Sequence, residues 1–341
     1  MGSLSNKGLN LTGWAKGPDG CSACTSQPPG SMLLPQVKPK VVRALPNDPV
    51  LGGNRLPRKK VEILALLLAP APALTVGVSV MRGGGIATDI WVMNVTAAVV
   101  GLSLASVALA WPDMMSGSRG FVPWLLLVGL ALLGATLLAP GTEGVHRWLP
   151  LGPVRIHAGA LLLPPLLVAL WEPAWVTSAI VALAVLLVLS LQPDAAQAAS
   201  FCAAWVGMAG VRRGWKATPV IVVSVLAAAA CLLRHDPLEP VPHVEGIVGM
   251  AASQGSVLAA AGLLSLVALP LAFVLFLERP FGIVLALYTV GTLIAAWLGN
   301  YPVPVLGYGV SPVLGYYGAV VMCVLLYRPG EVLSSEGAAA F

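Results

Sequence analysis

Four short polar segments interrupt an otherwise strongly apolar chain, and they hold the residues that could do chemistry. The first runs from His146 to Gly152 and contains Arg147 and Trp148; Arg155 follows closely. A planar guanidinium can bind a phosphate through two parallel hydrogen bonds, so this segment could hold an anionic head group. Arg and Trp are also enriched where membrane-spanning helices meet water, and an ordinary interfacial position explains the same residues.

The second and third segments each place a carboxylate just before an apolar run. In Gln192-Pro193-Asp194, the acid is suited to the start of a helix, where the helix dipole favours it. Because a charge in the membrane interior is costly, Asp194 lies either in a tight turn near the surface or against a polar interior.

The third segment, Pro242-His243-Val244-Glu245-Gly246, follows a proline-rich stretch that delivers His243 and Glu245 to the mouth of the next helix. A carboxylate at the edge of an apolar cavity can have a raised pKa, and such a group suits proton abstraction from a sugar hydroxyl. A glutamate favoured by the helix dipole alone is the alternative.

The fourth segment, Asn300 to Pro312, is rich in Gly, Pro and Tyr, and Tyr316 and Tyr317 follow it. Glycines allow close helix contact or non-helical backbone beside a cavity. An interfacial loop with an aromatic belt accounts equally for Tyr308 and its neighbours.

The composition requires a membrane around most of the chain. The 341 residues are 57% hydrophobic and 10% charged, with mean hydropathy +0.87, whereas soluble domains have about 25% charged residues. The apolar runs are long and continuous, without alternation, which favours helices over a barrel. We therefore predict an all-α polytopic membrane helix bundle. The five cysteines suggest no disulfide framework, and the lone Cys21/Cys24 pair does not establish a metal or redox site.

We divide the chain into a disordered cytoplasmic tail (1–59), a transmembrane domain (60–330) and a short cytoplasmic tail (331–341). About ten membrane spans are expected, at 61–81, 89–111, 121–139, 158–171, 174–191, 194–211, 218–233, 247–276, 281–298 and 312–327. Most of the 19 Lys and Arg residues fall on one face if the N-terminus is cytoplasmic, so the positive-inside rule places both termini in the cytoplasm. This sorting by loop argues against nucleic acid as a partner. The four histidines then lie on the opposite face.

Taken in order, the four segments resemble the FtsW/RodA/SpoVE (SEDS) family of polytopic cell-wall proteins. His146–Gly152 is similar to the family's G-x-x-R-W-I-x-L-G element, and Gln192-Pro193-Asp194 matches its Q-P-D element. His243-Val244-Glu245 falls where the family has His-Thr-Asp, and Pro304–Pro312 is similar to its P-F-x-S-Y-G-G-S element. The resemblance covers roughly residues 60–330.

The resemblance implies a peptidoglycan glycosyltransferase that polymerises lipid II, a polyprenyl-linked glycan precursor, outside the bacterial cytoplasmic membrane. It implies a role in cell division or cell shape, and a penicillin-binding-protein-type transpeptidase as partner. Glu245 would replace the essential aspartate as general base. Arg147 would stabilise the leaving polyprenyl pyrophosphate, and the resemblance leaves a divalent cation open. The substrate-binding residues that we predict are Arg147, Trp148, Asp194, His243, Arg234, Tyr308 and Ser311.

Two departures keep other functions open. His157-Ala158-Gly159 stands where the family has a segment with polar Glu and Lys, and the outer segment Arg234–Gly246 is short where the family has a long loop. A non-catalytic membrane scaffold that retains the fold and binds a cell-wall synthesis partner is therefore the alternative. A lipid or solute transporter ranks last, because few polar residues, chiefly Asn94 and Thr96, lie midway along the predicted helices.

Overall fold

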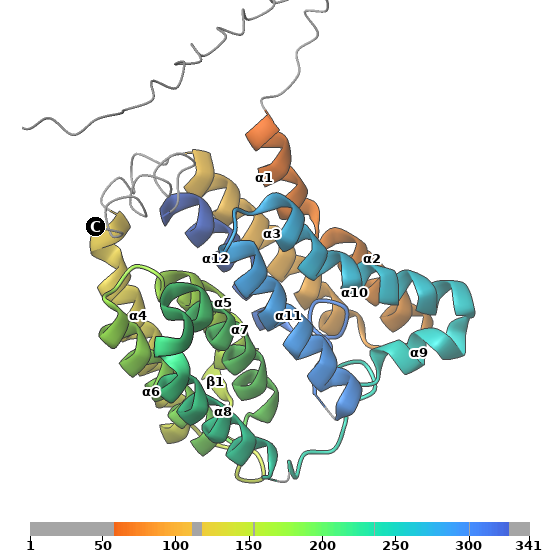
Figure 1. Ribbon diagram of the computed structural model, residues 1–341. Helices are drawn as coiled ribbons and strands as arrows, with labels where there is room; N and C mark the ends of the chain where they lie inside the picture. The colour runs from red at the N-terminus through yellow and green to blue at the C-terminus, as the bar shows by residue number, and fades with distance from the viewer. Residues whose placement is uncertain (1–57, 111–117, 153, 235, 300, 327–341) are drawn as a thin grey trace, which may run out of the picture. The chain divides into compact units, whose positions relative to one another are not determined.

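The computed structural model describes residues 58–110, 118–152, 154–234, 236–299 and 301–326 (Figure 1). The tails predicted for 1–59 and 331–341 lie outside these residues, except that residues 58 and 59 begin the first helix. The Cys21/Cys24 pair and His235 are likewise outside them.

Across the described residues the chain folds into helices and one small β-hairpin. The helices are α1 (Arg58–Leu68), α2 (Ala71–Gly83), α3 (Thr88–Ala110), α4 (Ser118–Ala135), α5 (Ala158–Ala169), α6 (Trp175–Leu191), α7 (Ala195–Arg213), α8 (Thr218–Leu232), α9 (Ile247–Gln254), α10 (Ser256–Phe276), α11 (Phe281–Leu298) and α12 (Val310–Leu326). Short 3-10 turns, η2 (Thr136–Leu138) and η3 (Gly214–Ala217), follow α4 and α7. The hairpin pairs β1 (Trp148–Leu151) antiparallel with β2 (Val154–His157), with Trp148 opposite His157.

These helices confirm the prediction of an all-α polytopic membrane bundle. The first predicted span is divided into α1 and α2, where Pro70 precedes α2. The span predicted at 247–276 is divided into α9 and α10 by Gly255, whose φ of 148° is accessible to glycine. Six described segments are long and apolar enough to cross a membrane; Ala195–Leu232, which contains α7 and α8, is one of them. Helices α5, α6 and α12 are apolar but shorter.

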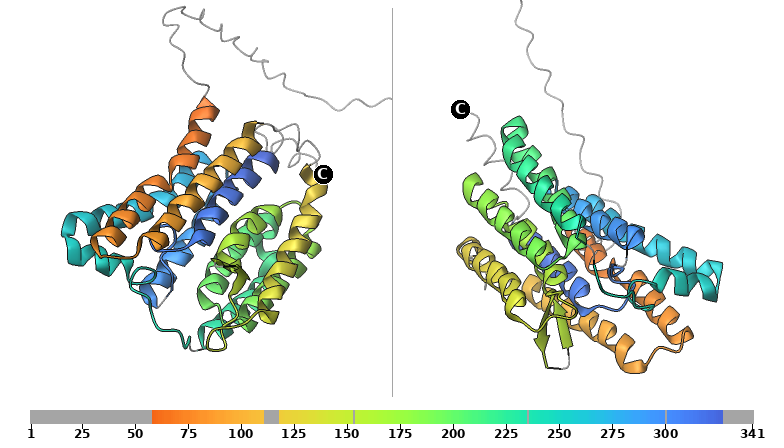
Figure 2. Two further views of the ribbon diagram at one scale, coloured as in Figure 1. Left: turned by 180° about the vertical axis from the view of Figure 1, so that it is seen from behind. Right: turned by 90° about the horizontal axis from the view of Figure 1, so that it is seen from below.

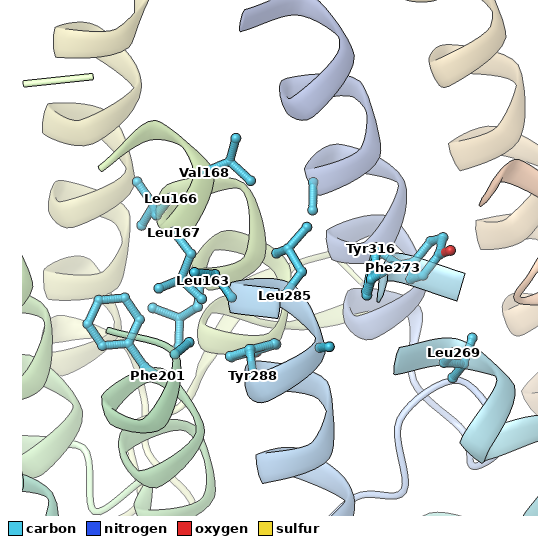
Figure 3. Close-up of a cluster of buried hydrophobic side chains, with 14 of the residues drawn as sticks. Leu163, Leu166, Leu167, Val168, Phe201, Leu269, Phe273, Leu285, Tyr288 and Tyr316 are labelled. Carbon is cyan, nitrogen blue, oxygen red and sulfur yellow. The ribbon is translucent and has the colours of Figure 1, made fainter. Parts of the chain in front are cut away.

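The surface and the interior of the bundle are both apolar, as expected when lipid is the solvent. Leu104, Ile180 and Leu264 are 64%, 63% and 72% exposed, although each lies within an apolar helix. The interior is filled by large side chains such as Leu163, Phe201 and Leu285 (Figure 3). Outward apolar side chains on many helices, with no matching polar face, are typical of contact with lipid tails.

Close helix contacts in the centre depend on small residues. Helices α7 and α11 pack together, and α12 packs against both α5 and α3. At Gly315 of α12, a Cβ atom would lie 2.2 Å from the carbonyl oxygen of Ala160 in α5. Small residues allow backbones to approach where no hydrophobic effect drives helices together. This contact holds α12 against the start of α5, where the candidate site lies.

The alternating course of the helices brings several connections to one end of the bundle. They are the β1–β2 hairpin, the α6–α7 turn and the α8–α9 and α11–α12 segments, all of which contribute to one cavity. Figure 2 includes a view from below in which the hairpin is visible.

Candidate functional site

A cavity of about 250 Å³ lies where these connections meet the helix ends. The hairpin contributes Trp148, Arg155 and His157, and Arg147 immediately precedes it. The remaining polar or charged side chains that line it are Asp194, Gln197, Glu245, Tyr288, Thr289, Thr292, Tyr301, Tyr308, Ser311 and Tyr316. Buried apolar side chains such as Leu269, Phe273 and Leu285 also line it. A largely apolar cavity with a few convergent polar groups is the usual form of a ligand site.

Arg147 is the central cation of the cavity and is almost completely buried, with 3% of its surface exposed. Its Nη2 donates to the Pro193 carbonyl oxygen at 2.5 Å and to Asp236 Oδ2 at 2.6 Å. Its guanidinium also lies 5.9 Å from the centre of the Tyr301 ring. Burial acts to lower the pKa of Arg147, but the charges of Asp194 and Asp236 outweigh it and raise that pKa. Arg147 therefore carries a fixed positive charge, and the two carboxylates of Asp194 and Asp236 act on it.

Asp194 combines a structural role with a position in the cavity. It is the N-cap of α7, and its Oδ1 accepts a hydrogen bond from the Gln197 backbone N–H at 3.3 Å. Its Oδ2 is buried and has no hydrogen-bond partner among the described residues. The capping position predicted from Pro193-Asp194 is thus observed, and it leaves one carboxylate oxygen available at the cavity.

His157 faces Asp194 from the end of β2. Its Nδ1 accepts from the Ala160 N–H at 3.2 Å, which makes His157 the N-cap of α5. An accepting Nδ1 places the proton of a neutral imidazole on Nε2, which lies 3.4 Å from Asp194 Oδ2. Burial, assisted by the charge of Arg147, lowers the pKa of His157 despite the opposing effect of Asp194. The imidazole is therefore neutral at neutral pH, with its Nε2–H directed towards the carboxylate.

Glu245 lies in the α8–α9 segment, one residue before the N-cap of α9. Its Oε2 accepts from the Val241 backbone N–H at 2.7 Å. The side chain is half-buried at the cavity, and burial raises its pKa although backbone hydrogen bonds and the charge of Arg147 oppose the shift. A carboxylate with these properties can act as a proton acceptor closer to neutral pH than an ordinary glutamate.

The α11–α12 segment forms the opposite wall and is held by backbone hydrogen bonds. The Tyr308 N–H donates to the His243 carbonyl at 2.9 Å, and the Val303 N–H donates to the Val244 carbonyl at 3.3 Å. Asn94, buried in α3, donates to the Gly307 carbonyl at 2.9 Å and accepts from the Gly309 N–H at 2.9 Å. Loops that carry lining residues are therefore fixed to a helix of the bundle.

The structure brings together most of the residues predicted to bind or act on a substrate. Glu245, Arg147, Trp148, Asp194, Tyr308 and Ser311 all line the cavity. His243 and Arg234 are not part of that lining. The His243 ring instead packs against Tyr308, with 6.1 Å between ring centres, and Arg234 Nη1 donates to the Ser190 carbonyl at 2.5 Å. Gln192 also points elsewhere, because its Nε2 bonds to the Leu133 carbonyl at 2.7 Å.

Other lining residues were not predicted as part of the site. They include His157, whose backbone N–H donates to the predicted Ser311 Oγ at 2.8 Å, and Tyr288, which donates to Gln197 Oε1 at 2.5 Å. Gln197 stands three residues after the N-cap Asp194, which is the spacing of a capping box and a signal for its position. Tyr288 interrupts an apolar helix, and a polar group in such a helix marks an internal partner or cavity.

The described residues offer no set of three or more His, Cys, Asp or Glu side chains placed to hold a metal ion. The described residues therefore do not fit a divalent cation that is held by protein ligands alone.

The fold and the cavity define a polytopic helical membrane protein with a polar site at one end of its bundle. No family model and no curated protein sequence matches the chain.

Solved structures do match it. A structure of Thermus thermophilus rod shape-determining protein RodA carrying an aspartate-to-alanine substitution is similar to this chain with a TM-score of 0.56 and 22% identity, over 78% of this chain and 98% of that one. A second structure of Thermus thermophilus RodA is similar with a TM-score of 0.54 and 19% identity, over 78% of this chain and 97% of that one. The chain therefore has a RodA-like fold, and the resemblance drawn from four short segments is confirmed at the level of the fold.

Proposed function

We propose that this protein is a divergent SEDS-type protein of a bacterial cytoplasmic membrane that binds a polyprenyl-linked glycan precursor and polymerises glycan strands in cell division or cell-shape control. The observation that carries the proposal is the convergence of Glu245, Arg147 and Asp194 on one cavity, in a bundle that folds like RodA.

Glu245 is the general base in this proposal. Its carboxylate takes the proton of the acceptor sugar hydroxyl as that oxygen attacks the anomeric carbon of the donor sugar. The bond between that carbon and the polyprenyl pyrophosphate breaks, and the pyrophosphate leaves with the bonding electron pair. The raised pKa that follows from burial of Glu245 suits this proton transfer.

The proposed orientation places the cavity on the outer face. Both termini are then cytoplasmic, and the polar cavity faces the side on which glycan strands are assembled. The apolar surface of the helices holds the polyprenyl chain in the bilayer, next to the cavity. A penicillin-binding-protein-type transpeptidase is the proposed partner.

Polymerisation of labelled lipid II by purified protein in nanodiscs, with and without a candidate transpeptidase, tests the proposal. We expect polymer from wild type, no polymer from Glu245→Gln, and wild-type amounts from Glu239→Gln. Glu239 is the matched control because it is an exposed acid in the same segment.

Two results contradict the proposal. Equal polymer from Glu245→Gln and wild type removes Glu245 from the chemistry. Absence of polymer from folded wild type in both arms, with the transpeptidase bound, supports the scaffold instead.

A further inference from the structure

Among the described residues, two arginines line the cavity, Arg147 and Arg155. Their electrostatic surroundings differ. Arg147 is buried, pairs with Asp236 at 2.6 Å, and has the charge of Asp194 close enough to affect its pKa. Two carboxylates around one guanidinium leave a local excess of negative charge, because the nearby His157 is neutral. An anionic ligand group is therefore disfavoured at this buried end.

The same buried end has an unpaired donor and an unpaired acceptor. Arg147 Nε and Asp194 Oδ2 are both buried without a hydrogen-bond partner among the described residues, although His157 Nε2 lies 3.4 Å from Asp194 Oδ2, longer than a normal hydrogen bond. Arg147 and Asp194 both line the cavity. Buried polar atoms are normally paired, so these two indicate a missing ligand group or water. A hydroxyl or a secondary amide both accepts and donates a hydrogen bond, so it matches the chemistry of an unpaired donor and an unpaired acceptor in one cavity. A phosphate can accept from Arg147 but has nothing to donate to Asp194.

Arg155 provides a contrasting environment at the rim. It lies in β2, opposite Pro150, and its side chain is exposed while lining the cavity. Its Nη1 donates to the Thr142 hydroxyl at 3.2 Å, and it forms no ion pair with an acid in the part of the chain that the structure describes. Its charge and most of its donors are thus available for a phosphate.

We propose that the two ends of the cavity bind different parts of one ligand. The Arg147–Asp194 end binds an uncharged hydroxyl or amide of the sugar, and Arg155 binds the pyrophosphate. This inference rests on the proposed function, since it assigns parts of the same lipid-linked glycan. The family resemblance implies Arg147 as the contact for the leaving pyrophosphate. The present proposal assigns that contact to Arg155 instead.

Binding to full-length protein in zwitterionic phosphatidylcholine nanodiscs tests the division. The two probes are lipid II and a polyprenyl pyrophosphate that carries no sugar. We expect Arg155→Gln to weaken binding of both probes about tenfold, as loss of a charge-assisted hydrogen bond does. Arg82→Gln is the matched control, because Arg82 is an exposed arginine outside the cavity lining, and it should bind both probes like wild type.

Asp194→Asn tests the buried end, because the proposal predicts whether binding of each probe becomes weaker, tighter or stays the same. Asparagine keeps an oxygen that can cap α7 and removes the charge. We expect weaker binding of lipid II and unchanged binding of the sugar-free pyrophosphate. Tighter binding of the sugar-free probe, or no effect of Arg155→Gln, overturns the inference while the proposed function stands. Failure of wild type to bind lipid II overturns both.

Discussion

His157 Nε2 lies 3.4 Å from Asp194 Oδ2, and Asp194 is buried beside it. The pair connects the end of β2 to the start of α7, and each residue also caps its own helix through the other side-chain atom. Because the imidazole is neutral and the carboxylate oxygen is otherwise unpaired, the pair is sensitive to the protonation of His157.

Acid should destabilise the protein through His157. Its pKa in the folded protein is lowered from 6.5, so as pH falls below 6.5 the unfolded state takes up a proton before the folded state does. The stability contributed by the neutral imidazole is present above pH 6.5 and decreases as pH falls towards the lowered pKa. We expect the midpoint temperature of thermal unfolding in detergent, followed by tryptophan fluorescence, to decrease as pH falls from 6.5 towards the lowered pKa. The decrease should be smaller in His157→Gln. An identical pH dependence in both proteins would refute this role.

Asn94→Ala should destabilise the wall formed by the α11–α12 segment. The change removes partners of the Gly307 carbonyl and the Gly309 N–H, and unpaired buried backbone groups cost about 1–3 kcal/mol. Thermal unfolding measures the loss, and Thr96→Ala, at an exposed position on the same helix, should change little. Equal midpoints for the two variants contradict the assigned contact.

Gly315→Ala should force α12 away from α5. The added Cβ would meet the Ala160 carbonyl oxygen at 2.2 Å, whereas at Gly318 the nearest atom, in the Pro165 side chain, is 3.6 Å away. Overpacking of this kind costs about 1–3 kcal/mol. We therefore expect a lower unfolding midpoint for Gly315→Ala and a near-native one for Gly318→Ala. A reversed order would show that this helix contact is wrong.

The rate of polymer formation should fall in acid because Glu245 must be ionised to accept a proton. Burial raises its pKa above 4.5, so the acid limb of the rate profile should have its midpoint above 4.5. Glu245→Asp should retain a reduced rate, since it keeps the carboxylate, and Glu245→Gln should have none. A wild-type rate that stays constant down to pH 4.5 argues against Glu245 as the base.

The sequence was sufficient for the fold class because membrane helices are specified by local apolar composition. It did not predict the β1–β2 hairpin or the division of two predicted spans at Pro70 and Gly255. It also located six cavity-lining residues, because polar side chains between apolar runs must lie at a surface or in a cavity. The positions of the other site residues depend on tertiary contacts that the sequence does not show. His243 contributes its backbone carbonyl to Tyr308 rather than its ring to the cavity, and Gln197 and Tyr288 meet across two helices. No spacing along the chain encodes such a pairing.

Photocrosslinking of lipid II tests most directly the claim that this cavity is the glycan site. Benzoylphenylalanine is placed at Tyr308, which lines the cavity, or at Trp124, which is 64% exposed on α4 and outside the lining. We predict a crosslink to labelled lipid II at Tyr308 that excess unlabelled lipid II suppresses, and no suppressible crosslink at Trp124. Equal labelling at both positions, or none at Tyr308 in folded protein, would contradict the account.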